Sequence, residues 1–186
     1  MTAAPAGADS SEIWQQQCGV CHGAAGEGNR ALGAPALTQL SSDYLARQLT
    51  HFVNGVRGAD PKDQAGHRMA LSVALLAPSD IPALAAFIST DLPPSRPEAT
   101  RKGDAARGKD YYTHLCSACH GGNALGNPIL GAPALAGASD WYLKSSYQSF
   151  LDGLRGQHAD DVYGAQMARL APALPDEDDL EAVIAH

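Results

Sequence analysis

Two short segments hold the residues of this chain that are best suited to chemistry. Residues 18–22 read Cys-Gly-Val-Cys-His and residues 116–120 read Cys-Ser-Ala-Cys-His, and together these segments use all four cysteines of the sequence. Two thiols three positions apart can each bond one vinyl group of a porphyrin, and the next residue, histidine, then lies under the iron as a ligand. The pattern therefore predicts covalent attachment of a c-type haem at each segment.

A single Cys-x-x-Cys-His segment is not specific to haem, because zinc sites and redox-active dithiols also use closely spaced cysteines. A zinc site built from both cysteine pairs would leave His22 and His120 without a role. Two copies of the pattern that use every cysteine therefore favour haem over these alternatives. We expect two covalently bound haem c groups, attached through Cys18, Cys21, Cys116 and Cys119.

An internal repeat relates the two segments. Cys116 lies 98 residues after Cys18 (116 − 18 = 98), and at this offset residues 11–88 align with residues 109–186 without a gap. Self-similarity at a fixed period indicates one structural unit that is used twice. The matched segments are 33–37 with 131–135, Tyr44-Leu45 with Tyr142-Leu143, and 55–58 with 153–156.

The repeat predicts two similar domains, residues 1–92 and 103–186, each with one haem. The linker between them, residues 93–102, contains three prolines, which exclude a regular helix and indicate a short stiff spacer. Residues 1–10 are rich in alanine, glycine and serine, which is typical of a loose leader. A domain of about 90 residues is marginally stable on its apolar core alone, so a large apolar haem would complete each core.

The methionines add a second set of candidate ligands. Apart from Met1, the chain has only Met69 and Met167, which are separated by the same 98 residues as the cysteines (167 − 69 = 98). Methionine is usually a flexible core filler, but matched positions in both repeats favour a distal iron ligand. A thioether opposite a histidine raises the reduction potential and leaves the iron no open position. This ligation favours electron transfer over oxygen activation.

The remaining histidines have no histidine partner in the other repeat. His67 lies two residues before Met69 and could compete for the iron, but its counterpart is Ala165. We expect all five of these side chains to be exposed to solvent. They are His51, His67, His114, His158 and His186.

Apolar periodicity and capping residues predict an all-α chain. The first expected helix is capped by Ser10 or Ser11 and runs to about Cys18. The others run over 42–56, 81–90, 105–116 and 140–154, and from about 175 to 186. We expect glycine-rich residues 23–33 to form a loop beside the haem, and residues 58–68 to form a loop that delivers Met69.

Two further features have open interpretations. The carbonyl of Pro35 could accept a hydrogen bond from the ring of His22, or the proline could simply mark a turn. Arg57 could pair with a haem propionate, or it could lie at a helix end, where cations are favoured.

Composition excludes several classes of function. The net charge is -7, and an acidic surface repels phosphate backbones, so we do not expect nucleic-acid binding. No run of eighteen apolar residues occurs, so we expect no transmembrane segment.

The pattern as a whole resembles class I cytochrome c. Its elements are Cys-x-x-Cys-His-Gly, a Gly-x-Gly loop, Pro-x-Leu, Tyr-Leu, Phe-x-x-Gly-x-Arg, a methionine and a closing helix Asp-Ile-x-x-Leu-Ala-Ala-Phe. Two such domains in tandem resemble the dihaem cytochrome c4 family, and also the dihaem subunit of flavocytochrome c sulfide dehydrogenase. The resemblance covers nearly the whole chain after residue 10.

The resemblance implies two tandem class I cytochrome c domains related by a pseudo-twofold axis, with the haems near their interface. It implies that His22 and Met69 bind the first iron, and that His120 and Met167 bind the second. Other residues at positions expected to surround the haems are Pro35, Pro133, Arg57, Arg155, Tyr44 and Tyr142.

The sequence departs from the family pattern at two places. The closing helix of the second domain has no aromatic residue where the first domain has Phe87, and we expect this to weaken its packing on the first helix. The second domain also has Ala124 where the first has Gly26, which is a modest change.

We therefore expect a non-catalytic electron carrier. It would take one electron per haem from a dehydrogenase or another donor complex and pass it to a terminal oxidase or reductase. An alternative is a fixed subunit of a flavin-dependent enzyme such as sulfide dehydrogenase. A third is an enzyme or gas sensor in which one haem iron is open, which the paired methionines disfavour.

The expected location is the periplasm, because haem of this type is attached outside the cytoplasm. Residues 1–4 have neither the charged region nor the apolar stretch of a secretory signal. We expect a signal peptide or membrane anchor to have been removed ahead of this sequence.

Overall fold

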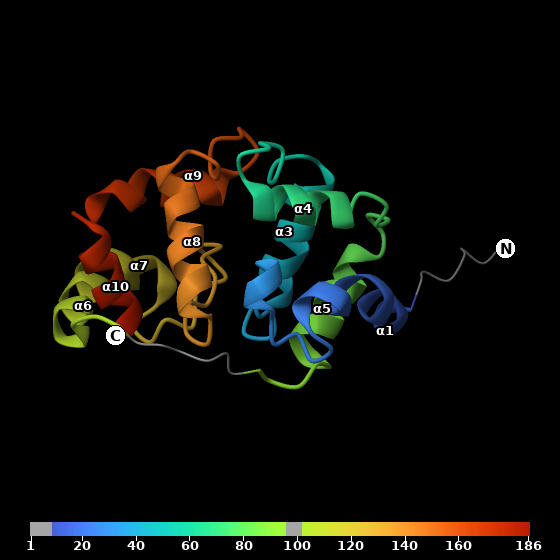
Figure 1. Ribbon diagram of the computed structural model, residues 1–186, viewed down its shortest axis with the longest axis horizontal. Helices are drawn as coiled ribbons and strands as arrows, with labels where there is room; N and C mark the ends of the chain where they lie inside the picture. The colour runs from blue at the N-terminus through green and yellow to red at the C-terminus, as the bar shows by residue number, and fades with distance from the viewer. Residues whose placement is uncertain (1–8, 96–101) are drawn as a thin grey trace, which may run out of the picture.

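The computed structural model describes residues 9–95, here called the N-terminal half, and residues 102–186, the C-terminal half. Within these ranges the regular structure is helical, and the only β-type pairings are isolated bridges, one between Asn29 and Ala34 and one between Asn127 and Ala132. The halves lie side by side, with α3 (Ser42–Val53) and α8 (Asp140–Leu151) on the sides that face each other (Figure 1). Most of the expected leader, residues 1–8, and most of the expected linker lie outside the described residues, and Ser10 belongs to α1 rather than to a leader.

Each half begins with one helix made of three consecutive pieces. In the N-terminal half these are α1 (Ser10–Ile13), a π-helical turn η1 (Trp14–Cys18) and α2 (Gly19–His22). In the C-terminal half they are α6 (Ala105–Tyr111), the π-helical turn η3 (Tyr112–Cys116) and α7 (Ser117–His120). The expected end at Cys18 was therefore wrong, because the helix continues through the whole Cys-x-x-Cys-His segment.

Glycine ends both of these helices. Gly23 and Gly121 follow the histidines with φ angles of 83° and 80°, a conformation that other residues rarely adopt. The N-terminal ends are capped by Asp9 and Asp104, whose carboxylates accept hydrogen bonds from backbone N–H groups in the first turn. The cap at Asp9 differs from the serine cap that we expected.

The methionines lie on short helices. Met69 belongs to α4 (Gln64–Ser72) and Met167 to α9 (Val162–Leu170). Asp63 and Asp161 cap these helices by accepting from the N–H groups of Gly66 and Gly164, at 2.9 Å in each case. The expected loop over residues 58–68 was therefore wrong in its last part. The carboxylate of Asp63 marks the start of a helix that we had expected to be part of the loop.

The other expected helices are present, α5 with the expected ends and the rest with shifted ends. They are α3 (Ser42–Val53), α5 (Ile81–Thr90), α8 (Asp140–Leu151) and α10 (Glu177–Ala185), and short 3-10 turns occur at η2 (Arg30–Leu32) and η4 (Ala171–Ala173). In the N-terminal half an apolar core forms where the first helix, α3 and α5 meet. Trp14 and Leu84 are almost fully buried in it.

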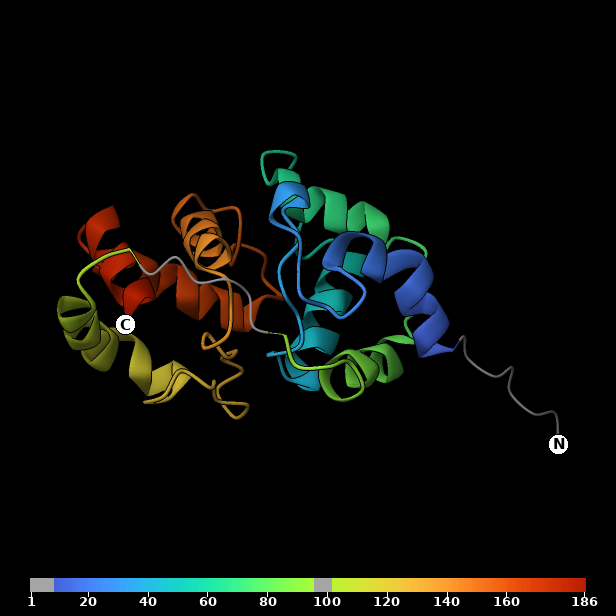
Figure 2. The same ribbon diagram turned by 60° about the horizontal axis from the view of Figure 1, so that its bottom comes forward.

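The C-terminal half packs its first and last helices differently. Gly108 of α6 lies so close to the backbone of Ala182 in α10 that a Cβ atom at residue 108 would overlap the Ala182 carbonyl. An ion pair between Arg107 and the buried Asp179 joins the same two helices. Our expectation that the missing aromatic residue weakens this packing was wrong, because small residues allow close backbone contact instead. Figure 2 shows α6 and α10 at the end of the molecule away from the N-terminal half.

Candidate haem-binding sites

The two histidines of the Cys-x-x-Cys-His segments are oriented by proline carbonyls. The Nδ1 atoms of His22 and His120 lie 2.8 Å from the carbonyl oxygens of Pro35 and Pro133, respectively. A carbonyl can only accept, so each Nδ1–H donates, and each Nε2 keeps a lone pair that can bind a metal. Of the two interpretations of Pro35, the one in which its carbonyl accepts a hydrogen bond from the ring of His22 is observed.

Burial keeps these imidazoles neutral. Desolvation lowers the pKa of His22 and of His120 below the ordinary value, and the hydrogen bond to the proline carbonyl opposes this effect only in part. A neutral ring is the form that binds a metal through Nε2. Both histidines are therefore prepared as ligands in orientation and in protonation state.

The cysteine pairs do not form a shared metal site. Burial, followed by the neighbouring thiol of Cys21, raises the pKa of Cys18 to about 11. Burial, followed by the thiol of Cys119, raises the pKa of Cys116. Protonated thiols are poor zinc ligands and poor redox nucleophiles. Within residues 9–95 and 102–186, no group of three or more His, Cys, Asp or Glu side chains could hold a metal ion. The zinc and dithiol alternatives therefore lack support.

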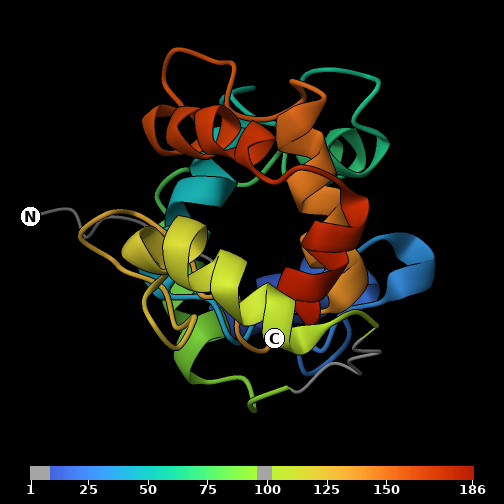
Figure 3. The ribbon, with the colours of Figure 1, turned by 90° about the vertical axis from the view of Figure 1, so that its left-hand side faces the viewer.

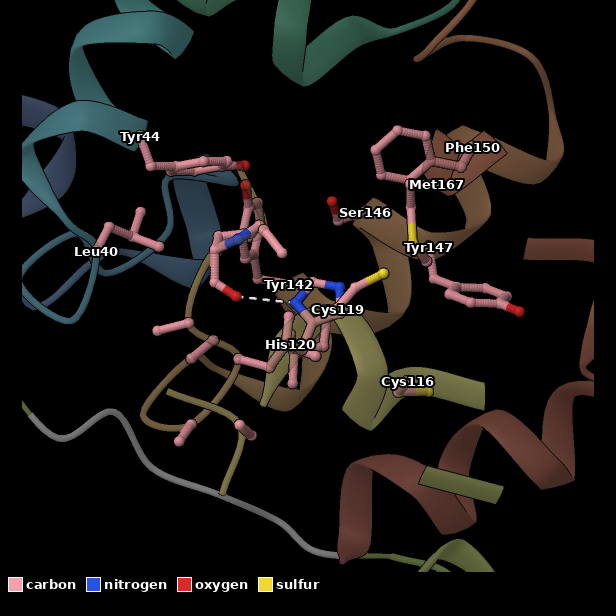
Figure 4. Close-up of a pocket in the computed structure, with 18 of the residues that line it drawn as sticks. Leu40, Tyr44, Cys116, Cys119, His120, Tyr142, Ser146, Tyr147, Phe150 and Met167 are labelled. Carbon is pink, nitrogen blue, oxygen red and sulfur yellow. Dashed lines mark hydrogen bonds between the residues drawn. The ribbon is translucent and has the colours of Figure 1, made fainter. Parts of the chain in front are cut away.

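A large cavity of about 860 Å³ lies in the C-terminal half and extends to its contact with the N-terminal half. Cys116, Cys119, His120 and Met167 all line it, and Figure 4 shows the ring of His120 and the side chain of Met167 on its wall. Figure 3 shows the helices of the C-terminal half arranged in a ring. The predicted surrounding residues Pro133, Tyr142 and Arg155 also line the cavity, and so does Tyr44 from the other half. The residues present suit a haem, since they combine attachment thiols, an imidazole and a thioether.

The corresponding residues of the N-terminal half converge on a much smaller pocket. Cys18, Cys21, His22 and Met69 line a space of about 30 Å³ together with apolar core side chains such as Leu84. The donor set is the same and suits the same group. Pro35, Tyr44 and Arg57 do not line this small pocket.

Two arginine–tyrosine pairs cross between the halves. The guanidinium group of Arg57 lies close enough to Tyr142 to interact electrostatically with it, and that of Arg155 does the same with Tyr44. Burial alone would raise the pKa of Tyr142, but the guanidinium groups of Arg57 and Arg155 outweigh burial and lower it. The pairs are equivalent under the internal repeat, so the contact follows the expected pseudo-twofold relation.

These arginines keep unused hydrogen-bond donors. Arg57 donates to Gln48 at 2.7 Å and Arg155 donates to Ser146, yet the Nε atoms of both arginines are buried without a hydrogen-bond partner. A buried guanidinium N–H without an acceptor is costly and suits an anionic ligand such as a carboxylate. Because Arg155 lines the large cavity, a haem propionate is a chemically suitable partner for it.

The sequence did not indicate that three residues, His51, Asp161 and Arg47, lie at the contact between the halves. His51 is buried, contrary to our expectation, because the C-terminal half covers its face of α3, and its Nδ1 lies 3.7 Å from Oδ1 of Asp161. Arg47, one helical turn before His51, also contacts the C-terminal half. The sequence does mark Arg47 and His51 as different between the repeats, because the second repeat has Ser145 and Ser149 at the same positions.

The other histidines differ in exposure. His67 is half-buried, and its Nδ1 lies 3.1 Å from the carbonyl oxygen of Gly58, away from any role as a competing ligand. His114, His158 and His186 are exposed as expected.

Comparisons with known proteins all point to one family. The cytochrome c family profile matches residues 8–91 and residues 105–186. The thiosulfate dehydrogenase electron acceptor of Thiomonas intermedia is 34% identical over 165 residues, which cover 82% of this chain and 71% of that protein. Cytochrome c4 of Stutzerimonas stutzeri is 27% identical over 154 residues, which cover 78% and 72% of the two chains. The FixP subunit of a cbb3-type oxidase from Bradyrhizobium is 34% identical over 135 residues, which cover 69% of this chain and 44% of that one.

Solved structures share the fold. The thiosulfate dehydrogenase TsdBA of Marichromatium purpuratum superposes with a TM-score of 0.71 at 29% identity, over 95% of this chain and 39% of that chain. Reduced cytochrome c4 of Pseudomonas stutzeri superposes with a TM-score of 0.69 at 23% identity, over 95% and 93% of the chains. This chain therefore spans less than half of the FixP and TsdBA chains but most of cytochrome c4.

Proposed function

We propose that this chain, which belongs to the cytochrome c family and has one domain of that family in each half, is a periplasmic carrier that accepts electrons from a dehydrogenase. It is a dihaem electron-transfer protein with two covalent haem c groups, attached at its two cysteine pairs. The proposal covers the class of electron donor, the periplasmic location and a linker at residues 93–102 between the domains. It also assigns the iron ligands, His22 with Met69 for the first iron and His120 with Met167 for the second.

The observation that carries the proposal is the matched pair of ligand sets. In each half a neutral histidine, fixed by a proline carbonyl, lines the same pocket as a methionine. A histidine and a methionine would together hold a haem iron, which would supply one-electron transfer and would keep no open position for a substrate. The chain itself binds no reactant in this scheme, which supports a carrier rather than an enzyme.

The protein's own residues keep the ligation stable during electron transfer. The Pro35 and Pro133 carbonyls hold the imidazole orientation, so the histidines need no rearrangement when the charge on the site changes. Arg155 lines the large cavity, where its guanidinium group would neutralise a haem propionate. A rigid, charge-balanced site lowers the reorganisation that each electron transfer requires.

The donor class follows from the relatives. One relative is named a thiosulfate dehydrogenase electron acceptor, and a structural neighbour is a thiosulfate dehydrogenase. We therefore propose that a periplasmic dehydrogenase supplies the electrons and that a terminal oxidase or reductase removes them. Within the described residues, no helix is long and apolar enough to cross a membrane.

A test of the carrier proposal is carbon monoxide binding to the fully reduced protein, followed in the visible spectrum. We expect no spectral change, because histidine and methionine close both irons. A change in half or all of the haem would mean an open iron and would favour an enzyme or a gas sensor.

A second candidate is a fixed subunit of a larger redox enzyme. It is favoured by the relatives in which this chain matches only a part, namely the FixP oxidase subunit and the TsdBA chain. Purification from the native source distinguishes the two. A stable complex with a flavoprotein or an oxidase would favour the subunit, and a free monomer would favour the carrier.

A further inference from the structure

Arg47 of the N-terminal half makes two contacts with the C-terminal half. Its Nη2 donates a hydrogen bond of 2.6 Å to the carbonyl oxygen of Gly131. Its guanidinium carbon lies 4.5 Å from the ring centroid of Tyr163, within the range of a cation–π contact, and 5.3 Å from that of Tyr44. One side chain of α3 thus touches two separate segments of the other half.

Those two segments carry the iron ligands proposed for the C-terminal site. Gly131 lies two residues before Pro133, whose carbonyl orients His120. Tyr163 lies on α9, one helical turn before Met167. The segments also touch each other, since a Cβ atom at Gly131 would collide with the Tyr163 ring. Arg47 therefore joins the wall that fixes the histidine to the helix that carries the methionine.

The N-terminal site makes the equivalent connection within its own half. There Nη2 of Arg68, on the methionine helix α4, donates to the carbonyl oxygen of Leu32 at 3.3 Å, next to Gly33. The second repeat has Gln166 in place of Arg68 and Ser145 in place of Arg47. The hydroxyl of Ser145 hydrogen-bonds the carbonyl of Tyr142 in its own helix and does not reach the N-terminal half.

A second contact from α3 acts on the same helix. His51 lies 3.7 Å from Asp161, and this carboxylate caps α9 by accepting from Gly164. Both side chains are buried. No residue of the C-terminal half lines the small pocket that holds Cys18, His22 and Met69, whereas Leu40, Tyr44 and Arg47 of the N-terminal half line the large one.

We propose that Arg47 is a positioning residue for the C-terminal haem, supplied by the N-terminal half. It holds the Met167 helix against the loop that fixes His120, so methionine ligation of the second iron depends on contact between the halves. Ligation of the first iron is held by Arg68 and does not depend on that contact. This inference rests on the proposed ligands of the two irons.

The test follows the methionine–iron charge-transfer absorption of the ferric full-length holoprotein during denaturant titration. Met69→His leaves this band only on the second iron, and Met167→His leaves it only on the first. In the first background, Arg47→Ala should shift loss of the band to lower denaturant. We expect about a tenfold larger fraction of iron without methionine at a given concentration, because a hydrogen bond from a charged donor and a cation–π contact are lost. In the second background it should have no effect.

Three variants serve as controls. Arg68→Ala should show the opposite selectivity and weaken only the first iron's band. Arg30→Ala removes an exposed cation of the same half and should change neither band. Arg47→Lys keeps the charge and can still donate to Gly131. The denaturant concentration at which its second band is half lost should therefore lie between those of Arg47→Ala and of the protein with Arg47.

The outcomes separate this inference from the proposed function. If the parent protein lacks the methionine–iron band, the ligand assignment fails. If the band is present but Arg47→Ala changes both irons equally, or neither more than Arg30→Ala does, Arg47 has no positioning role. Should Arg47→Ala fail to incorporate haem, Arg47→Lys, which loses the planar guanidinium group over the Tyr163 ring, must weaken the second iron's band selectively.

Discussion

The two haem sites are built from the same residue types at the same spacing, yet they differ in what surrounds them. The N-terminal site is lined by its own half alone and adjoins a core in which Trp14 and Leu84 are almost fully buried. The C-terminal site is a cavity of about 860 Å³ that is also lined by Leu40, Tyr44 and Arg47 of its neighbour. Repeated ligands therefore do not make repeated environments, and the properties of the second site include the contact between the halves.

Replacement of a methionine ligand gives the largest expected effect. Met167→Ala should lower the reduction potential of one haem and allow carbon monoxide to bind half of the total haem, because a thioether ligand is lost. Met69→Ala should do the same to the other haem. A spectroelectrochemical titration of both variants measures these changes. An unchanged titration in both would contradict the ligand assignment.

Gly108 gives the next largest effect, and only in the C-terminal half. Gly108→Val should destabilise this half by about 1–3 kcal/mol, because the new side chain overlaps the backbone of Ala182 and forces α6 from α10. The equivalent residue, Ser10, already carries a side chain, so Ser10→Val should have little effect. Chemical denaturation monitored by circular dichroism compares the two. Equal midpoints for both variants would show that the halves pack these helices alike.

Ala124 and Gly26 occupy the same loop position in the two halves, so substitutions there compare the halves directly. Both adopt the left-handed conformation, with φ of 59° for Ala124 and 71° for Gly26. Ala124→Gly should stabilise the protein by about 1 kcal/mol, because a Cβ atom is strained in this conformation. Gly26→Ala should destabilise it by at least as much, since its Cβ would lie 3.0 Å from the side chain of Thr38. Thermal unfolding of the two variants, expected to shift in opposite directions, provides the measurement.

His51 gives the smallest expected effect, and it depends on pH. Burial lowers the pKa of His51, the charge of Asp161 opposes this, and Arg47, Arg57 and Arg155 reinforce it. Above an ordinary histidine pKa of about 6.5 the ring is neutral in both the folded and the unfolded chain. Below it the unfolded chain binds the proton more readily, so stability falls as the pH decreases. His51→Gln should flatten the pH dependence of the denaturation midpoint between roughly pH 6.5 and 5, and an unaltered slope would exclude His51 as its source.

Much of the fold could be predicted because the haem motif and the repeat are local sequence patterns. The Cys-x-x-Cys-His segments, the matched methionines and the helices with strong apolar spacing were all visible in the sequence. The helix that carries Met69 was missed because it is only nine residues long and follows a loop directly, so that the capping aspartate, Asp63, is the main sign of its start. The first helix was ended too early because its π-helical turn has no sequence signature that we could read.

The contact between the halves could not be predicted from such patterns. Arg47 and His51 lie on a helix face that is polar in the sequence, which is typical of a solvent-exposed surface. Only the docking of the other half turns this face inward, and docking depends on residues more than 80 positions away, such as Gly131. Positions at which the repeats disagree, rather than agree, were the useful sign.

The crossed arginine–tyrosine pairs also bear on how such a chain can change. Arg57 meets Tyr142 and Arg155 meets Tyr44, so each half offers the other the same two residues. This reciprocity is the geometry of a symmetric homodimer, in which one patch complements itself. When two such copies share one polypeptide, a substitution alters one side of the interface at a time. Fusion thus frees each copy to specialise, and a self-complementary patch can become a directional one without the loss of its original contacts.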